Sequence, residues 1–169
     1  MGIDIYAKWK NQSKEEEKAQ FTGFSTVAGS VGYLREAYHG EPYVTHYLVE
    51  ESFKEDGAKI PAKVLRERLP AAVMLSIVRE AKLYSKERDK IRIEDTGKLL
   101  NIILDIFNSP KTGHKEIVEQ FTPETLKHVE RMIEEKILPK YAQSFVDFVE
   151  LCEKKEKETG EPCVIEASY

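Results

Sequence analysis

The sequence predicts an α+β domain: a small sheet that includes the N- and C-terminal strands, covered by several helices including a long C-terminal helix. Residues 3–9 alternate apolar and polar side chains, which is the period of a half-buried strand. Residues 163–168 have the composition of a last strand, after a Gly and a Pro that end a helical stretch. Between the two ends, apolar residues recur at a spacing of three or four, as on one face of a helix.

Length and composition favour one domain spanning residues 1–169. A chain of 169 residues is large enough to bury a continuous core without disulfides or metal. Its hydrophobic content of 41% and charged content of 33% are typical of an ordered globular chain rather than a disordered one. The net charge of -4 provides no concentrated basic surface, so we expect no binding to duplex nucleic acid.

The sequence also bears on location and cofactors. No apolar run is long enough to span a bilayer, and the first residues lack a basic segment followed by an apolar one, so we expect a cytoplasmic protein with no membrane partner. Cys152 and Cys163 have no Cys or His at ligand spacing, which favours reduced thiols over a zinc site. The glycines at 23, 29 and 32 match neither the dinucleotide fingerprint nor the phosphate loop, so no cofactor is expected.

Three elements are expected in the N-terminal third after the first strand. Ser13 followed by three acidic residues predicts a helix over residues 14–20. Residues 31–39 place Leu34 and Tyr38 on one helical face ahead of a Gly, which predicts a second helix. Residues 43–51 are rich in aromatic and β-branched side chains, which predicts a second strand.

The rest of the chain is predicted to be mainly helical. An apolar stripe runs over residues 61–84 straight through Pro70, so either one helix kinks there or a second helix begins. Residues 98–108 are apolar around much of a helical circumference, as in a central helix, and a short helix is expected from about 114 to 121. Thr-Pro-Glu at 122–124 marks a further helix start, and the stripe that follows crosses Pro139, which predicts one long, kinked C-terminal helix.

The strongest candidate site lies within residues 22–47, where small residues and glycines give way to tyrosines, two histidines and an Arg-Glu pair. The Arg35 guanidinium offers a rigid fork of donors for a carboxylate or phosphate, and tyrosines offer flat faces with a hydroxyl tip. If the predicted helix over 31–39 packs beside the first strand, these side chains converge with the polar face of that strand on one concave spot. The predicted site residues are Asp4, Tyr6, Tyr33, Arg35, Glu36, His39, Tyr43 and His46.

Two functions and one structural interpretation are compatible with this segment. The first is a cytosolic binding or interaction protein that uses the surface over residues 33–47, with a small molecule or a protein as partner and a homo-oligomer as a compatible state. The alternative is a hydrolase of a small phosphorylated or acylated substrate, with Arg35 as anion clamp and His39 or His46 as general acid/base near Glu36. In the structural interpretation, Arg35 pairs with Asp4 and the tyrosines lie at the rim of the core.

A metal site is not expected. Glu36 and His39 have the i, i+3 spacing of carboxylate-bridged metal sites, but such sites need further acidic residues from other helices. A hydrogen-bonded or solvated pair is the commoner outcome at this spacing.

Both ends of the chain resemble a group of small uncharacterised bacterial and phage-like proteins. The resemblance lies in M-G-I-D-I-Y-A-K-W and G-Y-L-R-E-A-Y-H-G-E-P-Y near the start and in E-T-G-E-P-C-V-I-E-A-S-Y at the close. It covers residues 54–144 poorly and carries no activity or ligand. It implies that the two ends build one shared unit, in agreement with the expectation that the first and last strands pair.

Overall fold

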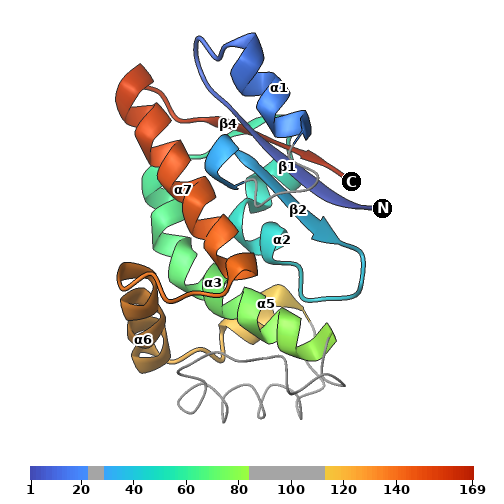
Figure 1. Cartoon of the computed structure of the whole chain (residues 1–169). Coiled ribbons are helices and arrows are strands. Elements are labelled where there is room, and N and C mark those ends of the chain that lie inside the picture. Colours follow the sequence, from blue (N-terminus) through green and yellow to red (C-terminus); the bar gives the residue numbers. More distant parts are fainter. Residues whose placement is uncertain (23–28, 84–112) are drawn as a thin grey trace.

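One four-stranded antiparallel sheet organises the protein. The computed structural model describes residues 1–22, 29–83 and 113–169 (Figure 1). The strands are β1 (Gly2–Lys8), β2 (Tyr33–Ala37), β3 (Ala58–Lys59) and β4 (Val164–Ser168), and they lie in the order β2-β1-β4-β3. The α+β class and the pairing of the first with the last strand, predicted from the sequence, are therefore confirmed, and the two termini lie close together (Figure 1).

The alternation of β1 gives the sheet an inner and an outer face. Ile3, Ile5 and Ala7 are fully buried on the inner face, while the residues between them face outward. Asp4 pairs with Arg35 and Ile3 pairs with Glu36 across the β1–β2 ladder. Directly paired residues share a face, so Arg35 lies on the outer face and Glu36 on the inner one.

Helices cover the inner face of the sheet. Helices α3 (Ala62–Leu83) and α7 (Lys140–Thr159) pack against each other, and their buried apolar residues form one core with the inner face of the sheet (Figure 1). Helix α6 (Pro123–Glu134) packs on α3, and two short helices, α2 (Val44–Leu48) and α5 (His114–Val118), pack on α3 and on each other. The 3-10 turns η2 (Gly29–Val31) and η3 (Glu50–Phe53) complete the described elements.

Helix α1 (Lys14–Thr22) begins at the predicted place, with reciprocal capping bonds. The Glu16 backbone N–H donates to Ser13 Oγ over 3.1 Å, and the Ser13 N–H donates to the Glu16 carboxylate over 2.9 Å. Near its other end, buried Gln20 donates to the carbonyls of Ala7 and Val31. These two bonds connect α1 to β1 and to the turn that precedes β2.

The predicted helix over residues 31–39 is wrong: this segment forms η2 and then the edge strand β2. Gly32 has φ +83°, a left-handed conformation that interrupts a right-handed helix and that Gly adopts without strain. Gly29 is also required, because a Cβ there would lie 2.0 Å from the Ser144 carbonyl oxygen of α7. The residues after this turn gain a full ladder of hydrogen bonds with β1, which a helix would forgo.

The predicted strand over residues 43–51 is also wrong: helix α2 and turn η3 occupy it. Val44 and Leu48 are both fully buried, and their i, i+4 spacing fits the inward face of a helical turn. Strand formation by β-branched residues depends on a neighbouring strand, and the short β3 pairs with β4 at that edge instead.

The predicted single helix across Pro139 is two helices, α6 and α7. Lys136 adopts φ 54°, which ends α6, and Pro139 takes the extended N-cap conformation of α7. A Pro has no N–H for the intrahelical bond and clashes with the preceding turn, so the chain restarts there. At Pro70, by contrast, α3 continues as one helix.

Other expectations for the C-terminal part have mixed outcomes. The start of α6 is confirmed, since Thr122 Oγ1 accepts from the Thr125 N–H and Pro123 occupies the first turn. The short helix expected over 114–121 is found as α5, which ends earlier, at Val118. The helix expected over 98–108 lies outside the described residues. Within the described ranges, no helix combines the length and the apolar character needed to cross a bilayer.

Candidate functional site

The predicted site residues lie in three separate places because β2 is a strand. The first place is an outer-face cluster formed by Asp4, Tyr6, Tyr33 and Arg35. Tyr33 Oη donates to Asp4 Oδ1 over 2.6 Å, and Arg35 Nη1 lies 3.6 Å from the same oxygen. The rings of Tyr6 and Tyr33 lie 5.3 Å apart between centroids.

In the outer-face cluster, the Tyr33 hydroxyl and the charges of Asp4 and Arg35 are engaged with one another. Burial, followed by the hydrogen bond to Asp4, raises the pKa of Tyr33, and burial also raises the pKa of Tyr6. The predicted structural pairing of Arg35 with Asp4 is thus present. The cluster joins β1 to β2 across the ladder.

The second place is the inner face, where Glu36 is 6% exposed and caps α2. Its carboxylate accepts from the Val44 N–H at 2.9 Å, from the Thr45 N–H at 3.4 Å and from Thr45 Oγ1 at 3.1 Å. Arg79 Nε of α3 lies 3.8 Å from Glu36 Oε2. Desolvation raises the pKa of Glu36, against the opposing effects of the Arg79 charge and of these hydrogen bonds.

The Arg79 guanidinium binds the loop that connects β2 to α2. The side chain donates to the carbonyls of Gly40 at 2.5 Å, Pro42 at 2.9 Å and Ala37 at 2.5 Å. The guanidinium carbon also lies 5.0 Å from the Tyr43 ring centroid. A buried ion pair by itself is weak evidence for stability. Here, however, the same arginine side chain also holds the loop at three carbonyls.

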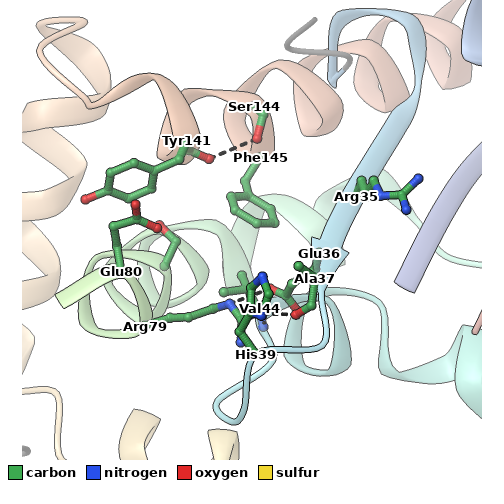
Figure 2. A pocket seen from close by; sticks show the side chains of 11 residues that line it. Arg35, Glu36, Ala37, His39, Val44, Arg79, Glu80, Tyr141, Ser144 and Phe145 are labelled. Atoms are coloured by element: carbon green, nitrogen blue, oxygen red, sulfur yellow. Dashed lines mark hydrogen bonds and ion pairs between the residues drawn. The ribbon is translucent and has the colours of Figure 1, made fainter. Parts of the chain in front are cut away.

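That loop forms one wall of a cleft of about 220 Å³, the β2–α3–α7 cleft. The other walls come from the C-terminal half of α3 and the first turns of α7 (Figure 2). Figure 2 shows the Arg35 side chain projecting away from this cleft, on the other side of the strand from Tyr141 and Glu80. The lining residues are Arg35, Glu36, Ala37, His39, Val44, Ser76, Arg79, Glu80, Tyr141, Ser144 and Phe145.

One buried polar group in the cleft lacks a partner within the described part of the chain: the Tyr141 hydroxyl is shielded from solvent and forms no hydrogen bond there. The Glu80 side chain, which also lines the cleft, is partly exposed. Burial, then the charge of Glu80, raises the pKa of Tyr141. Burial also raises the pKa of Glu80, with the Arg79 charge opposing it. A buried polar group without a partner is uncommon in a folded protein and calls for a ligand or water.

Other side chains add acceptors and an imidazole to the cleft. Ser76 Oγ donates to the Val73 carbonyl at 2.6 Å, and Ser144 Oγ donates to the Tyr141 carbonyl at 2.9 Å. Each hydroxyl oxygen keeps lone pairs that can accept a further hydrogen bond. His39 lies at the exposed rim.

The third place is an aromatic cluster around His46, outside the cleft. The His46 ring lies 4.2 Å from Phe53, 5.2 Å from Tyr43 and 5.9 Å from His114, between centroids. Burial, and then the charge of His114, lowers the pKa of His46. Burial, and then the charge of Lys115, lowers the pKa of His114. The two histidines proposed as alternative acid/base groups, His39 and His46, therefore lie in different surroundings.

The sequence reasoning missed Arg79, Glu80 and Tyr141. A signal was present for the first two, because residues 71–78 contain no charged side chain and an Arg-Glu pair follows directly. A cation that interrupts the most apolar face of a helix is expected to find a buried partner. Tyr141 lies in the apolar stripe that was predicted to cross Pro139, and its position in a cleft depends on how α7 packs on α3.

In comparisons with known proteins, no protein-family model, curated protein or solved structure matches the chain. Among the residues that the structure describes, no group of three or more His, Cys, Asp and Glu side chains is arranged to hold a metal ion. In the same ranges, Cys152 and Cys163 are buried free thiols.

Proposed function

We propose that this protein binds a small polar molecule in the β2–α3–α7 cleft. The observation that carries the proposal is the Tyr141 hydroxyl, which is shielded from solvent and has no hydrogen-bond partner within the described residues, close to the partly exposed carboxylate of Glu80. Binding sites are typically concave, with a few convergent polar groups and perturbed pKa values on an otherwise apolar lining. The apolar part of this lining comes from Ala37, Val44 and Phe145.

The buried Glu36–Arg79 pair supports the proposal. The pair fixes the loop wall before any ligand arrives, and a pre-formed wall reduces the ordering cost of binding. The cleft includes part of the surface over residues 33–47 that was expected from the sequence to bind a partner. The cytoplasmic location and a homo-oligomeric state remain predictions.

The hydrolase alternative has less support. An anion clamp at Arg35 would act on the outer face, where its guanidinium is engaged with Asp4. His39 lines the cleft, whereas His46 lies in the aromatic cluster. These three side chains do not converge on one substrate position, as acid/base and electrostatic catalysis requires.

A fragment screen by protein NMR tests the proposal on the full chain. We expect small polar fragments to shift the backbone amides of residues 37–44, 76–80 and 141–145 together. Tyr141→Phe removes only the unpartnered hydroxyl and should weaken these fragments, whereas the matched change Tyr169→Phe, at an exposed residue outside the cleft, should not. Fragments that bind only elsewhere, or none at millimolar concentration, would refute the proposal.

A further inference from the structure

The charge balance of the β2–α3–α7 cleft determines which ligand chemistry it accepts. Arg79 lines the cleft, but three of its five N–H donors bind the carbonyls of Ala37, Gly40 and Pro42, and its charge faces Glu36. Most of the guanidinium is therefore engaged by the protein itself, and its charge is matched by Glu36. The Arg35 side chain projects out of the cleft, toward Asp4 (Figure 2).

Glu80 is the acidic side chain of the cleft lining that Arg79 compensates only in part, since burial raises its pKa in spite of the Arg79 charge. It lies one position after Arg79 on α3, and Figure 2 shows its carboxylate on the same side of the cleft as the Tyr141 ring. Partial burial makes its ionised form costly, which is why its pKa is raised. A cation placed beside the carboxylate would relieve this cost.

We propose that the cleft recognises a ligand that carries an ammonium group, held between the Glu80 carboxylate and the Tyr141 hydroxyl. An ammonium has three N–H donors and no acceptor, and the cleft offers acceptors at Glu80, at the Tyr141 oxygen and at the Ser76 and Ser144 hydroxyls. The faces of Tyr141 and Phe145 add a surface that attracts cations. This inference rests on the proposed binding function and specifies its ligand class.

The size of the cleft limits the ligand to a small molecule. Its volume of about 220 Å³ exceeds the roughly 150 Å³ of an engineered apolar cavity that accommodates benzene. A single aromatic ring with a one-carbon arm that carries the ammonium therefore fits. Benzylammonium, benzyl alcohol and benzoate form a probe series of nearly equal shape with positive, neutral and negative head groups.

NMR titration of the full chain with these three probes tests the inference. We expect benzylammonium to bind about tenfold more tightly than benzyl alcohol, as one charge-assisted hydrogen bond allows, and benzoate to bind most weakly. Glu80→Gln should remove the preference for the ammonium while leaving benzyl alcohol affinity nearly unchanged. Glu67→Gln is the matched control, because it makes the same change on an exposed residue of α3 outside the cleft, and it should preserve the preference.

The outcomes separate this inference from the proposed function. If benzyl alcohol or benzoate shifts the cleft amides as strongly as benzylammonium does, the ammonium assignment is wrong while the cleft remains a binding site. If Glu80→Gln keeps the full preference, Glu80 is not the recognising group. If neither these probes nor the polar fragments shift the cleft amides, both proposals fail. Even if a variant does not fold, the order of the three probe affinities on the unmodified protein tests whether the cleft prefers an ammonium group.

Discussion

Removal of the Arg79 guanidinium should destabilise the fold far more than removal of an exposed arginine. In Arg79→Met, the carboxylate of Glu36 stays buried without its counter-charge, and three loop carbonyls lose their donors. Breaking a buried pair from one side costs about 3–5 kcal/mol, which is a large part of the roughly 5–15 kcal/mol by which a typical domain is stable. Glu36→Gln should cost less, about 1–2 kcal/mol, because the neutral amide still accepts from α2 and the Arg79 charge that it leaves is still held by three loop carbonyls.

Urea unfolding followed by fluorescence of Trp9, the single tryptophan, measures these free energies. The double variant should cost less than the sum of the two single variants, since each change removes the penalty created by the other. Arg79→Lys should lie in between, because a compact ammonium keeps the charge but cannot reach three carbonyls at once. Arg66→Met is the matched control: Arg66 pairs with Glu153 at 2.6 Å, but its side chain is 41% exposed, so the expected loss is about 1 kcal/mol or less.

Equal losses for Arg79→Met and Arg66→Met would refute this reasoning. Strict additivity in the double variant would refute it as well, because Glu36 and Arg79 would then act independently. In either case the loop wall of the cleft would be held by other contacts.

Three further perturbations follow from the same structure. Deletion of β4, which lies between β1 and β3, should abolish cooperative thermal unfolding, and unchanged stability would contradict the observed pairing. Because the pKa of His46 and His114 is lowered in the folded state, their contribution to stability is complete above about pH 6.5 and is lost as the pH falls below that value toward the lowered pKa. Urea midpoints between pH 7.5 and 5 should therefore fall less in the double variant His46→Gln/His114→Gln than in the unmodified protein, and an equal fall in both proteins would contradict this assignment. Ala substitution of Cys152 and Cys163 should leave a folded protein, with Cys152 the more sensitive, and mass spectrometry of unreduced protein should show no disulfide.

Elements with a complete local signal were predictable from the sequence. The alternation in β1, the Gly and Pro that precede β4, the capping residue Ser13 of α1 and the Thr-Pro-Glu start of α6 are each a local pattern with a defined end. At Gly160, φ 75° ends α7 where the sequence placed the end. In these segments the favourable interactions are made within a few residues, or depend only on which face is apolar.

The segment over residues 31–51 was assigned the wrong way round because its local preferences are weak. Intrinsic helix and strand preferences differ by about 1 kcal/mol or less per residue, so contacts from distant parts of the chain decide between them. The ladder with β1 makes Tyr33–Ala37 a strand, and the buried Glu36 carboxylate caps Val44–Leu48 as a helix. Both decisions depend on pairing partners that no local pattern contains.

The candidate site was likewise predictable in part from the sequence and in part only from the tertiary structure. The sequence by itself determined that a polar, aromatic segment lies near the chain start, and it included Glu36 and His39 among the candidates. Only the tertiary structure decided that Arg35 and Glu36 face opposite sides of the sheet, because successive side chains of a strand alternate. The packing of α7 on α3 then placed Tyr141 beside Glu80, residues 61 positions apart in the numbering, and a sequence pattern does not encode a contact between two helices that are so widely separated.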